Sequence, residues 1–379
     1  MDTIKSTSFQ RLSTNIGIDI GGSLVKIVLV DDVTGVGHDE GSENTTKEGN
    51  SDQHPFEAYI RAQVSQAQEV ELPAGWQARV IECGNTANMG SAQQKGAAAL
   101  RVLVFPTGDL EQVIDKIVLS HGEVTQRTKI CIAATGGGAH KFQSKLADKL
   151  HVEMAMVNEL KAVSGGWRFD VLQSGAINGK VEYPALICNV GTGVSLISVD
   201  EQGEFERVSG SGLGGATFWG LVKRLTKYTN FDNAVMAAHT SGNAGRADTL
   251  VGDIYGIETS KEIGMPPDLV AGFLGKLDSP NLSDADIVAA LLRMITNNLG
   301  QLAVFQARLT GAQSVWFTGG FFQSGSADSQ GAMGDASGII QGAVARAVVF
   351  WSAGKVQSLF PQNTSILGAL GAVIALDKE

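Results

Sequence analysis

The chain has 379 residues, of which 43% are hydrophobic and 18% are charged, which is the composition of an ordinary globular protein. This length predicts two hydrophobic cores, because single domains usually stop growing at about 250–300 residues. The formal net charge of −10 argues against nucleic acid or a membrane as a partner.

Three widely spaced cysteines indicate a reducing compartment and no metal cluster, so we expect a cytoplasmic protein. Residues 1–15 contain no hydrophobic core and are expected to form a flexible leader rather than a secretory signal. The apolar run 366–376 near the other end is too short to span a bilayer.

Residues 17–30 read GIDIGGSLVKIVLV and predict a buried strand, a glycine turn and a returning strand. Gly21 and Gly22 permit the tight turn because they lack a Cβ atom. Asp19 and Lys26 are the only charges in this segment. An acid beside a turn of outward-pointing amides suits a magnesium-bound phosphate, although an Asp that merely caps its own turn gives the same pattern.

Residues 186–201 read LICNVGTGVSLISVDE and repeat the hairpin 170 residues later. This offset places Asp19 on Asn189, Gly21 on Gly191 and Ile27 on Ile197. One such hairpin in each half of the chain resembles the actin, Hsp70 and sugar-kinase superfold, which is ribonuclease H-like. The resemblance implies two similar α/β domains with ATP in the cleft between them. We expect domains at 16–160 and 161–379, the second containing a dimerisation helix at 283–309. Val304, Phe305 and Leu309 are expected to extend the apolar surface of this helix beyond one face.

Between and after the hairpins, the sequence predicts further elements in chain order. The polar stretch 31–55 offers little to bury and is expected to be a loop. Asp232 and Ser283 are expected to cap the helices that they begin. Helices are predicted at 56–70, 109–120, 218–228, 232–239, 247–254, 283–309, 338–351 and 365–376, and strands at 78–83, 98–105 and 314–318.

Three more glycine-rich turns follow strands or precede helices: the GGG of ATGGGAHKF, the glycines of RVSGSGLGGATFWG, and Gly319-Gly320. Such turns can present helix N-terminal amides to an anion, but a close strand–helix connection needs the same glycines. The GK[ST] ending of a Walker motif is absent from the sequence. Glu159, the one acid between Glu153 and Asp170, is a candidate general base or a solvated helix residue.

Taken in order, seven segments resemble the eukaryotic-type (type II) pantothenate kinases: GIDIGGSLVKIVLV, ATGGGAHKF, NVGTGVSLISV, RVSGSGLGGATFWGL, ADTLVGDIYG, ITNNLGQLA and GALGA. They cover most of the chain from residue 16. The resemblance implies phosphorylation of pantothenate by ATP and Mg²⁺ to 4′-phosphopantothenate, the first step of coenzyme A biosynthesis. It also implies a homodimer and feedback inhibition by acetyl-CoA.

The resemblance also implies roles for single residues. Glu159 matches the catalytic base, and Asp19 matches the acid on the magnesium side, acting directly or through water. Thr192, Ser195 and Arg207 match residues that hold pantothenate. The ATP and phosphate contacts are implied at Gly21, Gly22, Ser23, Lys26, Gly191, Gly193, Gly214, Gly215, Gly319 and Gly320. The segment FTGGF at 317–321 has glycine where relatives often have Asn or Ser, which leaves the adenosine contacts open.

Three alternatives remain at this point. An Hsp70- or actin-like assembly ATPase would have a separate peptide-binding domain or a filament-sized insertion, and neither is evident in the sequence. A sugar kinase of the same superfold typically offers an Asp base with clustered Asn or His side chains, and no such cluster is evident in the sequence. A catalytically weak pseudokinase that senses acyl-CoA would not need Asp19, Lys26 and Glu159 together.

Overall fold

The computed structural model describes residues 15–32, 54–67, 72, 76–83, 98–121, 130–174, 181–323 and 335–376. The predicted leader and most of the polar stretch 31–55 lie outside these residues. The chain divides into two compact units, one of Met1–Gly179 with Ile366–Glu379 and one of Lys180–Ser365. The boundary that we expected at residue 160 therefore differs from the structure, because helix α4 and the C-terminal helix α11 both belong to the first unit.

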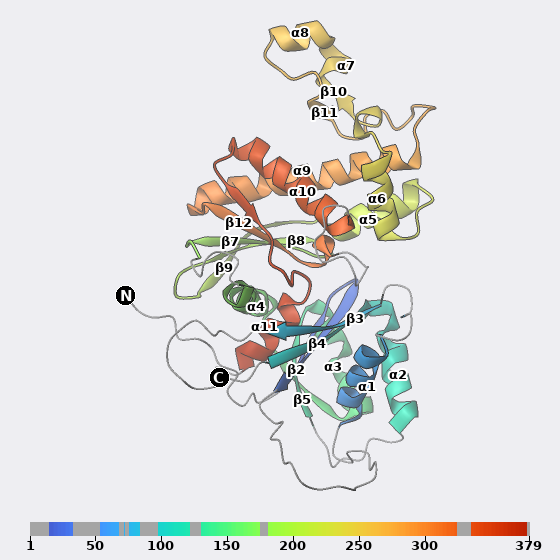
Figure 1. Ribbon diagram of the computed structural model, residues 1–379, viewed down its shortest axis with the longest axis vertical. Helices are drawn as coiled ribbons and strands as arrows, with labels where there is room; N and C mark the ends of the chain where they lie inside the picture. The colour runs from blue at the N-terminus through green and yellow to red at the C-terminus, as the bar shows by residue number, and fades with distance from the viewer. Residues whose placement is uncertain are drawn as a thin grey trace, which may run out of the picture. The chain divides into compact units, whose positions relative to one another are not determined.

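The first unit contains a six-stranded sheet in the order β3-β4-β2-β1-β5-β6. Helices α1, α2 and α3 pack on one face of it, and α4 and α11 on the other (Figure 1). The elements are β1 (Ile16–Ile20), β2 (Leu24–Asp32), α1 (Pro55–Gln66), β3 (Gln77–Cys83), β4 (Ala98–Pro106), η2 (Thr107–Asp109), α2 (Leu110–His121), β5 (Ile130–Thr135), α3 (Gly137–Leu150), β6 (Val152–Met156), α4 (Glu159–Ser174) and α11 (Leu367–Leu376).

The second unit contains a five-stranded sheet in the order β13-β12-β7-β8-β9, with α5, α6, α9 and α10 packed into its core. The short elements from β10 to β11 extend away from the rest of this unit (Figure 1). The elements are β7 (Ala185–Val190), β8 (Val194–Val199), β9 (Phe205–Ser211), α5 (Gly215–Leu225), α6 (Phe231–Thr240), η3 (Ala244–Arg246), β10 (Thr249–Leu250), α7 (Val251–Tyr255), α8 (Ile257–Glu262), β11 (Val270–Gly272), α9 (Asp284–Thr310), β12 (Ser314–Thr318), η4 (Gly320–Phe322), α10 (Ala336–Ser352) and β13 (Gln357–Leu359).

The two sheets share one strand order, which confirms the predicted fold class of two similar α/β domains. In the first unit β4-β2-β1-β5-β6 corresponds to β9-β8-β7-β12-β13 in the second. In both, the first three strands are antiparallel and the last two join in parallel. Strand β3 is an additional edge strand of the first unit.

Alternation along β1 decides which side chains face the core and which face α4 and α11. The isoleucines Ile16, Ile18 and Ile20 enter the cluster formed with α1, α2 and α3. Gly17 and Asp19 therefore face the opposite side, where a Cβ atom on Gly17 would lie 2.0 Å from the Ala369 carbonyl oxygen. The sheet thus presents the one acid of β1 to the face that α4 and α11 cover.

Helices α4 and α11 cross with their backbones almost in contact. A Cβ atom on Gly166 would lie 2.0 Å from the Leu367 carbonyl oxygen, and one on Gly371 would lie 1.7 Å from that of Ala162. The small residues of the C-terminal helix therefore serve close packing, as the sequence indicated. Because both glycines meet backbone atoms, no side chain can be accommodated at either position without moving a helix.

Most predicted elements lie within a few residues of their expected ranges, and two details were wrong. Residues 247–254 were predicted as one helix, but they turn from η3 through β10 into α7. Helix α6 is capped by Asn230, whose side chain accepts a hydrogen bond from the Asn233 amide, and not by Asp232. Ser283 does cap α9, in a capping box with Asp286.

Helix α9 is long and apolar enough to cross a membrane by length and composition alone. However, 56% of its apolar stretch is buried inside the second unit, where residues such as Leu291, Ile295 and Leu299 form the core. A buried core helix satisfies the same length and composition criteria, so we interpret α9 as the central helix of this unit.

Candidate functional site

The first unit holds Asp19 and Lys26 as a nearly buried ion pair. They stand opposite each other in the β1–β2 register, and Lys26 Nζ lies 2.8 Å from Asp19 Oδ2. A Cβ atom on Gly136 would lie 2.6 Å from Asp19 Oδ1, and one on Gly368 would lie 2.8 Å from Asp19 Oδ2. Gly136 also has a φ of 87°, which favours glycine. The carboxylate is therefore held in a space that only glycine neighbours leave open.

The turn after Asp19 is tied down by Thr107, a residue that the sequence analysis did not single out. The Thr107 amide donates to the Ser23 carbonyl, and its hydroxyl donates to the Gly21 carbonyl, both at 2.9 Å. The Gly21 amide donates across the turn to the Leu24 carbonyl at 2.9 Å. Gly22 and Ser23 remain exposed at the tip. The first predicted phosphate turn is thus a braced hairpin with an accessible tip.

Glu159 is the first residue of α4. The preceding Asn158 caps the helix, since its side-chain oxygen accepts hydrogen bonds from the amides of Leu160 at 2.9 Å and Lys161 at 3.1 Å. The residue is exposed, yet enough protein surrounds its carboxyl group to remove part of its hydration. This desolvation raises the pKa of Glu159, the charge of Asp19 raises it further, and Lys26 opposes both. The predicted base, metal-side acid and lysine therefore form one electrostatic cluster in the first unit.

This cluster predicts opposite effects from its two charged partners. In the protein without ligands, we expect carbon-13 NMR to give Glu159 a pKa above that of an unperturbed glutamate. Asp19→Asn removes a like charge and should lower this pKa, whereas Lys26→Met removes an opposite charge and should raise it. Each variant breaks the same salt bridge, so a shift in one common direction would show general disruption and contradict the electrostatic interpretation.

The residues around Asp19 fit a magnesium ion that arrives with its phosphates. Among the described residues, no group of three or more His, Cys, Asp or Glu side chains is placed to bind a metal by itself. Mg²⁺ usually keeps several waters and takes one or two carboxylates plus substrate phosphates. Asp19 supplies one such carboxylate, whose Oδ2 is already bound to Lys26. This donor set favours contact through water.

The second hairpin carries the neutral counterpart of the Asp19–Lys26 pair. Asn189 in β7 stands opposite Ser195 in β8. The turn here is one residue shorter, since Val190 pairs with Val194 whereas Ile20 pairs with Val25. The sequence offset of 170 therefore holds for the first strand of the hairpin only.

The returning strand is consequently displaced by one residue from the sequence alignment. Ile18 pairs with Ile27, and its counterpart Cys188 pairs with Leu196. The match of Ile27 with Ile197 was therefore wrong, and Ile27 corresponds to Leu196. By the same pairing, Ser195 occupies the position of Lys26.

The turn Gly191–Gly193 packs directly against the start of α5. The amides of Gly215 and Ala216 donate to the carbonyls of Gly191 and Thr192, at 2.9 and 3.2 Å. A Cβ atom on Gly214 would lie 2.8 Å from Gly193 Cα, and one on Gly215 would lie 2.8 Å from the Gly191 oxygen. Close backbone packing thus accounts for these glycines, and their contact with a nucleotide remains a prediction.

Two of the three predicted pantothenate residues come together in the second unit. Arg207 Nε lies 3.5 Å from Ser195 Oγ, beside a β-bulge at which Ile197 pairs with Arg207 and Leu196 with Ser209. Thr192 lies in the adjoining turn and is exposed. The guanidinium lies over Gly210, where a Cβ atom would be 2.1 Å from Arg207 Nη2.

A pocket of about 300 Å³ lies at the end of β9. It is lined by the end of β9 and by α9, through Gly210, Ser211, Leu213, Asn298, Leu299, Gln301, Leu302 and Phe305. Sequence analysis did not identify the lining residues on α9, and four of these five residues fall within the segment ITNNLGQLA. Arg207 is not a lining residue: it lies near Ser195, on the face of the sheet opposite to Val194 and Leu196, which pack with α9.

Gly319 repeats the role of Gly136. It has a φ of 104°, and a Cβ atom there would lie 2.3 Å from the Val190 oxygen and 2.8 Å from Asn189 Oδ1. Gly136 meets Ile20 and Asp19 in the same way. Gly320 then opens the short turn η4. The structure therefore explains Gly319 by its backbone, and a role of both glycines in binding ATP remains a prediction.

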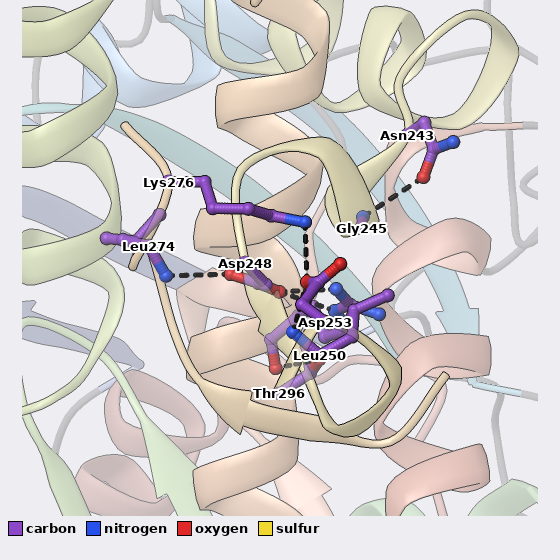
Figure 2. A network of polar contacts seen from close by, with 9 residues as sticks. Asn243, Gly245, Asp248, Leu250, Asp253, Leu274, Lys276 and Thr296 are labelled. Atoms are coloured by element: carbon purple, nitrogen blue, oxygen red, sulfur yellow. Dashed lines mark hydrogen bonds and ion pairs between the residues drawn. The ribbon is translucent and has the colours of Figure 1, made fainter. Parts of the chain in front are cut away.

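The segment ADTLVGDIYG, residues 247–256, contains β10 and α7 of the extension, and Figure 2 shows the contacts of its acids Asp248 and Asp253. Asp248 is fully buried and accepts hydrogen bonds from the Leu274 amide and from Arg293 Nε, both at 2.8 Å. Asp253 accepts from the Leu250 amide and forms an ion pair with Lys276, both at 2.7 Å. Asp248 thus links the extension to Arg293 on α9, and Asp253 links the start of the extension to Lys276 after its end.

We expect Asp248→Asn to destabilise the protein by about 1.5–3 kcal/mol. Whichever way the new amide turns, its NH₂ group faces a donor, either the Leu274 amide or Arg293. The matched control is Lys276→Met, which removes a partly exposed ion pair and should cost at most about 1 kcal/mol. Urea denaturation measures both, and equal midpoint shifts would contradict the structural role of Asp248.

Known proteins resemble this chain to different degrees. Among solved structures, a ROK family glucokinase from Streptomyces griseus superposes with a TM-score of 0.43 at 14% identity, covering 96% of this chain and 99% of that one. A glucokinase from Balamuthia mandrillaris gives 0.41 at 13% identity, covering 98% and 96%. Because these scores are low, the fold assignment rests on the strand order described above.

Curated relatives are more similar. Pantothenate kinase 1 of Arabidopsis thaliana is 35% identical, over 73% of this chain and 76% of that protein. Pantothenate kinase 2 of Oryza sativa is 35% identical, over 74% and 33%, and 4′-phosphopantetheine phosphatase of Mus musculus is 32% identical, over 75% and 35%. The chain thus spans about a third of the length of the rice and mouse proteins. The model of the Fumble family matches residues 15–375. The chain belongs to the Fumble family of type II pantothenate kinases.

Proposed function

We propose that the protein is a pantothenate kinase that transfers a phosphoryl group from ATP to pantothenate, giving 4′-phosphopantothenate in the first step of coenzyme A biosynthesis. The observation that carries this proposal is the cluster of Asp19, Lys26 and Glu159 beside the braced glycine turn, in a chain of this family. Phosphoryl transfer depends on positioning and charge neutralisation more than on covalent help, and this cluster supplies both.

Each residue then has a separate task. Glu159 accepts the proton of the pantothenate hydroxyl as it attacks, and its raised pKa makes it a stronger base than an ordinary glutamate. Lys26 offsets negative charge that grows on the transferred group. Asp19 holds the magnesium ion through water, and the ion, when bound, neutralises the phosphates. Arg207 binds the pantothenate carboxylate in the second unit, with Ser195 beside it.

The test is one assay of ADP release from Mg-ATP with separate acceptors: pantothenate, glucose, N-acetylglucosamine and none. We expect release above the acceptor-free rate with pantothenate alone. Release with glucose alone would instead support a sugar kinase, the alternative that the family assignment does not favour. A parallel incubation with 4′-phosphopantetheine measures phosphate release, since the mouse relative is named as a phosphatase.

We further propose a homodimer that forms through the C-terminal ends of α9 and α10. Phe305 and Leu309 on α9 are 43% and 79% exposed, and Val349 and Phe350 on α10 are each 56% exposed. Val304, which we expected to belong to this surface, is fully buried and does not. Exposed apolar patches of this kind mark interaction sites.

We expect the dimer mass by light scattering at micromolar concentration. Leu309→Glu together with Phe350→Glu should shift the protein toward monomer, because two charges would be buried in the contact. The matched control is Leu119→Glu on α2, an 84% exposed leucine of the first unit, which should leave the dimer intact. A monomer in the unmodified protein would defeat the proposal. Inhibition by acetyl-CoA is proposed on the family resemblance, and titrating acetyl-CoA into the pantothenate assay tests it. A cytoplasmic location is proposed on the three widely spaced cysteines.

A further inference from the structure

Thr135, the last residue of β5, lies next to the strand of Asp19 and is hydrogen-bonded to the segment that leads to Glu159. It is fully buried and pairs with Asp19 in the β1–β5 register. Its hydroxyl donates a hydrogen bond to the Val157 carbonyl at 2.9 Å. The Val157 amide donates in turn to the Ala134 carbonyl at 2.7 Å. Val157 is therefore tied to the end of β5 through both of its polar backbone atoms.

Glu159 follows Val157 by two residues, and a second set of hydrogen bonds fixes its backbone from the helix side. Asn158 caps α4 through the amides of Leu160 and Lys161, so that the helix begins at Glu159. The backbone of Glu159 is thus held between a strand end and a capped helix. Glu159 is exposed as a whole residue, and this backbone placement decides the region that its carboxyl group reaches.

We propose that Thr135 and Asn158 are positioning residues that hold Glu159 where it accepts the proton of the acceptor hydroxyl. This inference rests on the proposed kinase function. A general base must lie within about 2.6–3.2 Å of the proton donor, and a misplacement of about 1 Å costs on the order of a hundredfold in rate. A hydrogen bond that sets the start of α4 therefore acts on turnover through Glu159.

The second unit contains the same hydrogen bond without an acid. Thr318 ends β12, is fully buried and stands opposite Asn189. Its hydroxyl donates to the Thr364 carbonyl at 2.8 Å, and the Gly319 amide donates to the same oxygen at 3.0 Å. Two residues after Thr364 the chain has Ile366, which cannot accept a proton. The buried threonine thus belongs to the duplicated fold, and only its first copy precedes a candidate base.

The duplication supplies a matched control for the experiment. Thr135→Val and Thr318→Val each keep the side-chain shape and remove one buried hydroxyl that binds a carbonyl. We expect both to lower the melting temperature by similar amounts. Thr135→Val should also reduce kcat about ten- to hundredfold, with KM values for ATP and pantothenate changed less than about threefold. Thr135→Ser retains the hydroxyl and should restore most of kcat.

The decisive measurement repeats both substitutions in a Glu159→Gln background, with residual turnover followed by radiolabelled ATP. If Thr135 acts through Glu159, Thr135→Val should have almost no further effect on kcat there, because the effects of two residues that act as a unit are not additive. Thr318→Val should change kcat by the same factor in both backgrounds. A Thr135→Val effect of equal size in both backgrounds would overturn the proposal.

If Thr135→Val does not fold, Asn158→Ala at the exposed cap replaces it, and an effect of Asn158→Ala that is additive with Glu159→Gln overturns the proposal. If Glu159→Gln itself turns over at the wild-type rate, the assignment of the base and this proposal fail together. Phosphorylation of pantothenate that depends on Glu159 but shows additive Thr135 effects overturns the positioning role alone.

Discussion

Glu159→Gln should reduce kcat at least about a hundredfold while leaving the binding of ATP and pantothenate nearly unchanged. The amide has the shape of the carboxylate but cannot accept the hydroxyl proton, and a positioned general base contributes typically about 10²–10⁴-fold. The structure favours this role because Glu159 begins α4 within the electrostatic reach of Asp19 and Lys26. Steady-state kinetics and calorimetric titration with a non-hydrolysable ATP analogue measure the two parts separately.

The matched control is Glu153→Gln, the same substitution on the exposed side of β6. We expect it to leave kcat within about twofold of wild type, because β6 places Glu153 in the β5–β6 register opposite Cys131, away from the turn that ends the strand. A Glu159→Gln variant with near-normal turnover would mean that Glu159 is a surface acid and that another group takes the proton.

The sequence was sufficient for those features that depend on local periodicity and on glycine. Alternating isoleucines and a Gly-Gly pair predicted β1, its turn and β2, and the structure shows that the alternation also turns Asp19 toward α4 and α11. The capping of α9 by Ser283 likewise follows from neighbouring residues alone. Local patterns of this kind need no knowledge of the rest of the fold.

The features that sequence analysis missed depend on residues far apart in the chain. Thr107 binds the Gly21 carbonyl across 86 residues, and Thr135 binds Val157 across 22. The first unit includes the C-terminal helix, so no single cut at residue 160 could describe the units. Residues 247–254 do not form the predicted helix, because buried Asp248 lies in a bend and forms an ion pair with Arg293 on α9. Helical periodicity contains no information about that distant partner.

Gly214 and Gly215 show how one pattern can have two physical causes. Their density before a helix was interpreted as room for a nucleotide. In the structure, a Cβ atom at either position would meet the Gly191–Gly193 turn, so packing alone requires glycine. The one-residue difference between the two hairpin turns is similar, because a uniform offset of the sequence cannot reveal a shorter turn.

Arg207→Met should selectively impair the use of pantothenate. Pantothenate ends in a carboxylate, whereas pantetheine has a neutral amide with a thiol arm at that place. If the Arg207 guanidinium binds the carboxylate, its loss removes a charge-assisted contact worth about 1.5–3 kcal/mol. At about 1.4 kcal/mol per tenfold, kcat/KM for pantothenate should fall roughly ten- to hundredfold.

The discriminating quantity is the ratio of kcat/KM for pantothenate to that for pantetheine, because damage to folding or to ATP binding cancels in it. The matched control is Arg224→Met on α5, an exposed arginine of the same unit, which should leave the ratio unchanged. Equal losses for both substrates in Arg207→Met would show that Arg207 acts on phosphate or on structure, since pantothenate has a negative charge at that end and pantetheine has none.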